Sequence, residues 1–337
     1  MISLLLIACQ DYNLKGPGED QPGKYNPPEL ASTVQNDRIT QVTVPAVDVL
    51  WVIDNSCSME EEQFALRSNF DSFMTYFTGS GLDYHVGVVS TDMDNGREAG
   101  RLIKDTSRGS SYIDASVDAA TAIESFGERA ALGTLGSSDE RGKDAAQAAL
   151  SDHADTFNAG FLREEATLSV IVISDERDYS RVSVNEFVNW YKYLKPEQDM
   201  LSFNSIVGPA PRGCATAEKG TGYLEVTNQI GGIEWSICTD DWGGLLSELG
   251  LHAAGLKREF FLSLVPVDGT IEVLVESRDG SQTRTFDTSE WTYSRARNSV
   301  TFVEYTPDPL SVVSVTYEIL ASAQDPGVED TGDTGAE

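Results

Sequence analysis

The stretch AVDVLWVID, residues 46–54, decides the fold of this 337-residue chain. Its apolar run is broken only by Asp48 before it ends at Asp54, and it is rich in β-branched residues. A short, nearly continuous apolar run of this kind predicts a strand that is buried on both faces, as in a parallel sheet. Helices are therefore expected along the chain on either side of such strands.

Strand-like and helical segments do alternate after residue 54. Apolar residues recur at helical spacing over residues 60–77, whereas YHVGVVST at 84–91 and LSVIVIS at 168–174 are again apolar and β-branched. A further strand is expected at 201–207, and further helices are expected at 114–131, 140–152, 182–194, 223–230 and 242–254. This alternation predicts an α/β domain, doubly wound and Rossmann-like, over residues 44–255.

The pattern changes after residue 256. Short strand-like segments separated by turn signals follow one another to residue 321, and TIEVLVES, residues 270–277, alternates apolar with polar residues. They predict a small, β-sandwich-like, all-β module over residues 256–321. Residues 322–337 hold five acids and no base, which predicts a disordered acidic tail.

The first nine residues, MISLLLIAC, carry an apolar run too short to span a bilayer. The run resembles the end of a bacterial lipoprotein signal peptide, because LIAC at 6–9 matches the lipobox. The resemblance implies a lipid anchor on Cys9 and a place in the bacterial cell envelope, at the outer membrane. The basic segment of a signal peptide is missing before Lys15, and a partly buried N-terminal strand is the alternative. Residues 10–43, rich in Gly, Pro, Asn and Asp, predict a flexible linker.

The charge of the chain limits its partners. It holds 24 Lys and Arg against 54 Asp and Glu, a net charge of −30. Nucleic acids and acidic membrane surfaces are disfavoured, because phosphate binding needs basic patches. The charge suits cations or a cationic protein surface. Solubility or adaptation to a salty medium explains it equally well.

The four cysteines are Cys9, Cys57, Cys214 and Cys238. Cys214 and Cys238 flank a glycine-rich stretch within one expected domain, and in an exported protein they are expected to form a disulfide. Metal binding by these two is disfavoured, since neither belongs to a CxxC pair and the three histidines are scattered. Cys57 is expected to be a small packed residue.

The residues that carry chemistry follow the first strand. Asp54, Ser56 and Ser58 form a D-x-S-x-S pattern at the carboxyl end of a parallel strand, where open α/β sheets bind ligands. A loop can point these three side chains inward and leave the two intervening residues facing away. One carboxylate and two hydroxyls are hard oxygen ligands, which suit Mg²⁺, Mn²⁺ or Ca²⁺. The alternative is a helix N-cap, with Glu61 three residues after Ser58 as in a capping box.

Residues 46–252 resemble the von Willebrand factor A (vWA) domain with its metal-ion-dependent adhesion site (MIDAS). Two more elements match besides D-x-S-x-S. Ser137 stands five residues before Gly142, where the family has a threonine, with Ser138 as the fallback, and Asp175 directly follows the core strand at 168–174. The resemblance implies a metal site of Asp54, Ser56, Ser58, Ser137 and Asp175 that holds Mg²⁺, with Mn²⁺ or Ca²⁺ as alternatives.

The family resemblance also implies a function. Several ligands of such a site are neutral hydroxyls, so the cation keeps residual charge and an exchangeable position. A carboxylate of a protein partner can occupy that position. The chain is therefore expected to be a lipid-anchored envelope protein that binds a partner through a divalent cation. The alternative is a structural or assembly scaffold of an envelope complex, without metal-gated binding.

Enzymatic activity is not expected. The sequence has no G-x-S-x-G elbow, no phosphate-binding G-x-x-x-x-G-K-[ST] loop, no G-x-G-x-x-G and no HExxH. A metal-dependent hydrolase of unfamiliar type is the remaining possibility. Two other acidic segments are expected to be surface loops: Asp92-Met93-Asp94-Asn95-Gly96, which alternatively holds a second Ca²⁺, and the loop with Glu176 and Asp178.

Overall fold

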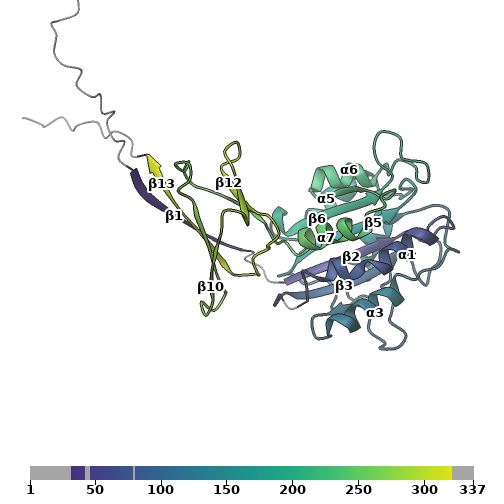
Figure 1. Ribbon diagram of the computed structural model, residues 1–337. Helices are drawn as coiled ribbons and strands as arrows, with labels where there is room; N and C mark the ends of the chain where they lie inside the picture. Colours follow the sequence, from purple (N-terminus) through teal and green to yellow (C-terminus); the bar gives the residue numbers. More distant parts are fainter. Residues whose placement is uncertain (1–31, 42–45, 79, 321–337) are drawn as a thin grey trace, which may run out of the picture.

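The computed structural model describes residues 32–41, 46–78 and 80–320. Two lobes lie side by side in Figure 1: an α/β domain built on a twisted sheet, and a smaller lobe of antiparallel strands at one end of it. The described residues include no helix that is both long and apolar enough to cross a membrane.

The α/β domain contains a six-stranded sheet in the order β4-β3-β2-β5-β6-β7. Only β4 is antiparallel to its neighbour. The chain adds β3 on one side of β2 and later adds β5 on the other, so the carboxyl end of β2 lies at a topological switch point. The predicted doubly wound α/β architecture is confirmed. The strands are β2 (Ala46–Ile53), β3 (Asp83–Ser90), β4 (Ile113–Asp114), β5 (Thr167–Ser174), β6 (Leu201–Val207) and β7 (Glu234–Ser236).

Helices cover both faces of this sheet because β2 is apolar on both faces. Trp51 points into one core, where it meets Phe70 and Phe73 edge-on, while Leu50 and Val52 point into the other. The first face carries α1 (Glu60–Ser68), α2 (Phe70–Met74), α3 (Ala119–Arg129) and α7 (Trp242–Ala253). The second carries α4 (Gly142–Gln147), continued by a π-helical turn (Ala148–Asp152), with α5 (Val184–Tyr191) and α6 (Tyr223–Ile230). A short 3₁₀ turn, Gln198–Met200, precedes β6.

The smaller lobe consists of a four-stranded sheet, β1-β13-β9-β10, and a three-stranded sheet, β11-β12-β8. One hydrophobic core, which includes Val273, Val275 and Phe302, joins them. These antiparallel sheets confirm the expected β module. Its strands are β1 (Ser32–Thr40), β8 (Glu259–Phe261), β9 (Glu272–Glu276), β10 (Thr283–Phe286), β11 (Trp291–Ser294), β12 (Ser299–Phe302) and β13 (Val312–Leu320).

The strand β1 corrects one expectation. A flexible linker was predicted over residues 10–43, and this is wrong for 32–40, which pair with β13 along their whole length. The sequence STVQNDRIT lacks an apolar alternation because most of its side chains are exposed. Main-chain pairing forms the strand, together with buried Asp37, which accepts hydrogen bonds from Ser263 and Tyr317. The β module is therefore discontinuous, and the α/β domain is inserted between β1 and β8.

Other predictions concern residues outside the described ranges. These are the signal remnant at 1–9 with Cys9, the linker over 10–31, and the acidic tail at 322–337. Cys214 and Cys238 are joined by a disulfide between the loops that follow β6 and β7, with their Cα atoms 6.7 Å apart.

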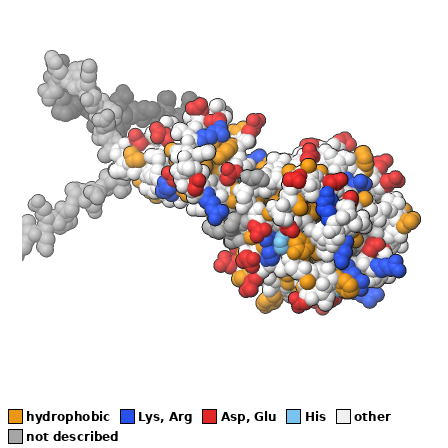
Figure 2. Space-filling view, turned by 90° about the horizontal axis from the view of Figure 1, so that it is seen from below, with side chains coloured by type: hydrophobic (Ala, Val, Ile, Leu, Met, Phe, Trp, Pro, Cys, Tyr) orange, Lys and Arg blue, Asp and Glu red, His pale blue; other side chains and the backbone are white. Residues whose placement is uncertain are grey.

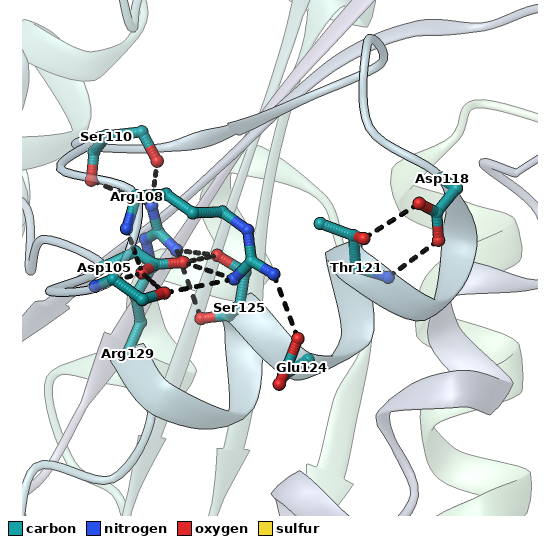
Figure 3. Close-up of polar contacts among 9 residues, drawn as sticks. Asp105, Arg108, Ser110, Asp118, Thr121, Glu124, Ser125 and Arg129 are labelled. Carbon is teal, nitrogen blue, oxygen red and sulfur yellow. Dashed lines mark hydrogen bonds and ion pairs between the residues drawn. The ribbon is translucent and has the colours of Figure 1, made fainter.

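Buried carboxylates in the α/β domain are paired with basic side chains at three places. Asp48, the one polar residue within β2, is fully buried and accepts a 2.8 Å bond from Nε of Arg163. Figure 3 shows the second place, where Asp105 of the loop after β3 meets Arg129 of α3. Ser125 lies between them and donates to Asp105 at 2.6 Å. The third place is the pair of Lys143 and Asp178.

The Asp105 cluster gives a stability prediction with a built-in control. Arg129 is fully buried, whereas the side chain of Arg108, which also pairs with Asp105, is 34% exposed. Arg129→Met leaves a buried carboxylate short of its partner and is expected to lower the free energy of unfolding by about 3–5 kcal/mol. Arg108→Met is expected to cost about 1 kcal/mol or less. Urea unfolding measures both, and equal losses would contradict this explanation.

Candidate metal centre

Asp54 is fixed at the carboxyl end of β2. Its backbone N–H donates to the carbonyl of Ile173 in β5 at 3.0 Å, and its side chain is fully buried. One carboxylate oxygen accepts a bond from the backbone N–H of Ser56 (2.8 Å), and the other accepts a bond from the hydroxyl of Ser174 (2.6 Å). The carboxylate is thus held between the ends of β2 and β5, at the switch point.

The two serines and Asp175 gather around it. The hydroxyl oxygens of Ser56 and Ser58 lie 3.2 Å apart, and Ser58 is a hydrogen-bonding neighbour of Asp175. Asp175 is buried, and its Oδ1 has no hydrogen-bond partner. The structure therefore brings together four of the five residues expected to hold the metal: Asp54, Ser56, Ser58 and Asp175.

The helix-capping alternative for D-x-S-x-S is not what the structure contains. The residue that caps α1 is Met59, and no side chain donates or accepts a bond as its cap. The hydroxyls of Ser56 and Ser58 are consequently not engaged with the end of α1.

The residues between the ligand candidates face away, as the loop pattern predicts, but with different surroundings. Asn55 is buried, and its carbonyl accepts a bond from the N–H of Gly136 at 2.9 Å. A Cβ on Gly136 would lie 2.2 Å from the Asn55 side-chain oxygen, so this close approach requires glycine. Cys57 was expected to be packed, yet it is an exposed free cysteine, because the loop turns it outward.

The hydrogen bonds of Ser137 lie outside this group. Its hydroxyl donates to the exposed Asp94 at 3.1 Å and accepts a bond from the N–H of Asp139. The fallback, Ser138, is exposed on the same loop. Neither hydroxyl has a hydrogen bond to Asp54 or Asp175 among the described contacts.

Glu140 is the residue that the sequence analysis missed. It is fully buried, lies next to Asp54, and accepts a short hydrogen bond from the hydroxyl of Thr91, just after β3. Its second oxygen, Oε1, is buried and has no hydrogen-bond partner. In the sequence, Glu140 stands out only as a glutamate two residues before the Gly142 that opens α4, close to Ser137.

Backbone and side-chain bonds hold Glu140 in place from three sides. Its carbonyl accepts a bond from Tyr179 N–H at 2.6 Å, and the N–H of Arg141 donates to the carbonyl of Thr91 at 3.2 Å. Lys143, one turn further on, forms an ion pair with Asp178 at 3.1 Å. Asp178 was expected in a surface loop, but its side chain is almost fully buried because this pair ties the loop after β5 to α4.

The carboxylates at this edge repel one another. Burial raises the pKa values of Asp54 and Asp175, and hydrogen bonds from neighbouring serines only partly oppose it. Burial, with the nearby charge of Asp54, raises the pKa of Glu140 to about 9. The same two causes raise the pKa of half-buried Glu176.

A missing basic partner distinguishes this edge from the rest of the domain. Asp48, Asp105 and Asp178 each have one, whereas Asp54, Glu140 and Asp175 form no ion pair with any described Lys, Arg or His. Buried charges normally require compensation. Within the described ranges no three His, Cys, Asp or Glu side chains form a metal cage, so hydroxyls must contribute to any site here. Carboxylate and hydroxyl oxygens are the ligands that hard divalent cations prefer. Two of the carboxylate oxygens here, Oε1 of Glu140 and Oδ1 of Asp175, have no hydrogen-bond partner.

The segment from Asp92 to Gly96 forms a turn. The side chain of Asp92 accepts bonds from the N–H groups of Asp94 and Asn95, at 2.9 and 3.0 Å. A turn is what the sequence predicts here, but Asp92 itself is buried and not solvated.

Comparison with known proteins finds structures that resemble this chain only at low sequence identity. No protein-family model and no curated sequence matches the chain. The pilus adhesin SpaC from Lactobacillus rhamnosus GG is similar at 12% identity over 87% of this chain and 42% of its own, with a TM-score of 0.46. A von Willebrand factor type A structure from Catenulispora acidiphila is 11% identical over 87% of this chain and 62% of its own, with a TM-score of 0.39.

A third similar structure is proximal thread matrix protein 1 from the mussel byssus, with a zinc-occupied MIDAS motif. It is 10% identical over 65% of this chain and 48% of its own, with a TM-score of 0.39. The chain spans less than two thirds of the length of each of these three proteins. At these scores the likeness assigns neither a family nor a function.

The raised pKa of Glu140 predicts how stability depends on pH when a chelator is present. The folded state binds this proton more tightly than the unfolded state, whose glutamate has an ordinary pKa near 4.5. The stabilisation is present below pH 4.5 and is lost as the pH rises towards 9. The free energy of unfolding is expected to fall across this range, and less steeply in Glu140→Gln.

Urea unfolding at several pH values in EDTA measures this slope. Glu60→Gln, at an exposed position on the same side of the domain, is the matched control and should keep the wild-type slope. Parallel curves for wild type and Glu140→Gln would contradict the burial of an uncompensated carboxyl at this edge.

Proposed function

We propose that the carboxyl edge of β2 and β5 binds a divalent cation, and that this cation binds an acidic group of a protein partner. The supporting observation is the set of buried carboxylates that lack a basic partner, at the point where the strand order reverses. Asp54, Ser56, Ser58 and Asp175 supply the oxygens. Ser137 lies on the loop that borders this edge and is not needed for the proposal.

The chemistry of these groups favours Mg²⁺, with Mn²⁺ or Ca²⁺ as alternatives. The hydroxyls of Ser56 and Ser58 are neutral, so they leave charge on the ion. Waters complete the coordination and can be exchanged for a carboxylate of the partner. This is a binding function, and it requires no catalytic group.

Apolar side chains beside the edge favour a protein as the partner. Phe64 of α1 is 69% exposed and Leu135 is 99% exposed, on the loop that Gly136 fixes to Asn55. A hollow of about 770 Å³ lies between α1 and the loop at 131–134. Exposed aromatic and aliphatic groups of this kind are enriched in the buried cores of protein contacts.

The acidity of the chain gives the cation a further role. Figure 2 shows one face of the molecule, on which acidic side chains are spread over both lobes and interspersed with basic ones. With a net charge of −30, such a surface repels an acidic partner unless a cation intervenes. We also propose that the chain is anchored in the cell envelope through Cys9, on the lipobox pattern alone.

Metal titration tests the proposal. By isothermal calorimetry on the full chain, Asp54→Asn is expected to weaken Mg²⁺ binding at least tenfold, about 1.4 kcal/mol, because it removes the charged oxygen at the centre of the group. Asp94→Asn, whose side chain is 66% exposed on a neighbouring loop, is the matched control and should bind as wild type does.

Two results would count against the proposal. Equal heats of Mg²⁺ binding for wild type and Asp54→Asn would show that Asp54 is not part of a metal site. Metal binding by wild type together with partner capture that survives a chelator would instead favour the structural scaffold.

A further inference from the structure

We propose that Glu140 is a direct ligand of the cation and takes the position that the family resemblance gave to Ser137. This inference rests on the proposed function, since it concerns the same cation. It changes the charge of the site, because a carboxylate replaces a hydroxyl.

Three elements converge on Glu140. It directly precedes the turn into α4, it contacts Thr91 at the end of β3, and it is close enough to Asp54 at the end of β2 for the two charges to interact. It is fully buried, yet only one of its oxygens has a partner. An unsatisfied carboxylate oxygen in that setting is costly. A cation between Glu140 and Asp54 satisfies it and removes the repulsion between the two carboxylates.

The surrounding structure is built to hold Glu140 in this position. The N–H of Gly142 donates to the hydroxyl of Tyr223 at 3.1 Å, and a Cβ at Gly142 would lie 2.7 Å from that oxygen. With the bonds to Thr91 and Tyr179, this fixes the backbone on both sides of Glu140. A ligand that is preorganised in this way needs no loop movement to reach the ion. The hydroxyl of Ser137 is instead engaged with Asp94 on a neighbouring loop.

The identity of this ligand determines what the cation can do. Asp54, Asp175 and Glu140 together carry three negative charges when ionised, which more than neutralise a divalent ion. The ion should therefore be bound tightly in the absence of a partner, and its attraction for a partner carboxylate should be weaker than with a hydroxyl at this position. Glu140 thus sets the balance between holding the metal and capturing an acidic group.

Calorimetry with Mn²⁺ on the full chain tests the ligand assignment. Glu140→Gln is expected to weaken Mn²⁺ binding at least tenfold, and Ser137→Ala to leave it unchanged. Glu176→Gln is the control for general electrostatic attraction, because Glu176 is a half-buried carboxylate of the same edge, and it should change the affinity less than about threefold. Thermal unfolding in EDTA confirms that each variant is folded.

Glu140→Thr tests the consequence for capture. At saturating Mn²⁺, acetate serves as the carboxylate probe and water-proton relaxation reports its entry into the coordination sphere. The threonine variant should bind Mn²⁺ more weakly than wild type but acquire acetate at a lower concentration.

The outcomes separate the two proposals. If Asp54→Asn loses Mn²⁺ while Glu140→Gln does not, the role of Glu140 is refuted and the proposed function survives. A loss in Ser137→Ala equal to that in Glu140→Gln also refutes it, as does equal acetate binding in wild type and Glu140→Thr. If neither Asp54→Asn nor Glu140→Gln changes Mn²⁺ binding, the proposed function itself fails.

Discussion

The burial of carboxylates without a basic partner is the constraint on which this structure depends. Asp54, Glu140 and Asp175 are removed from water, and burial together with the charge of a neighbouring acid raises the pKa of each. Elsewhere the same domain neutralises its buried acids, as Arg163 does for Asp48. Such an arrangement is unfavourable while the carboxylates are charged, and a bound proton or a divalent cation compensates it.

The fold places this edge at the end of the α/β domain that lies away from the β module. The α/β domain is inserted between β1 and β8, so the chain enters β2 and leaves α7 on the side of the β module. Gln41 donates to the carbonyls of Lys257 and Pro307 there, and Arg258 donates to Tyr76 of the α/β domain. The carboxyl end of β2 lies at the opposite end of that strand, away from these junctions (Figure 1).

Much of this could be predicted from the sequence because burial on both faces leaves a clear signature. The apolar runs at 46–54 and 168–174 predict the central strands, and the polar residues that follow them predict the edge. The strand β1 could not be predicted, since main-chain pairing with β13 rather than apolar alternation forms it. Glu140 was missed because its burial depends on contacts with Thr91 and Tyr179, which are distant in sequence.

The central claim is that a cation occupies the edge between Asp54 and its neighbours. A crystal structure of the protein grown with Mn²⁺, with anomalous diffraction recorded at the manganese edge, tests this claim most directly. The account predicts one strong anomalous peak within coordination distance, about 2.0–2.6 Å, of oxygens from Asp54, Ser56 and Ser58. A map with no peak at the ends of β2 and β5, or with its strongest peak elsewhere, would contradict it.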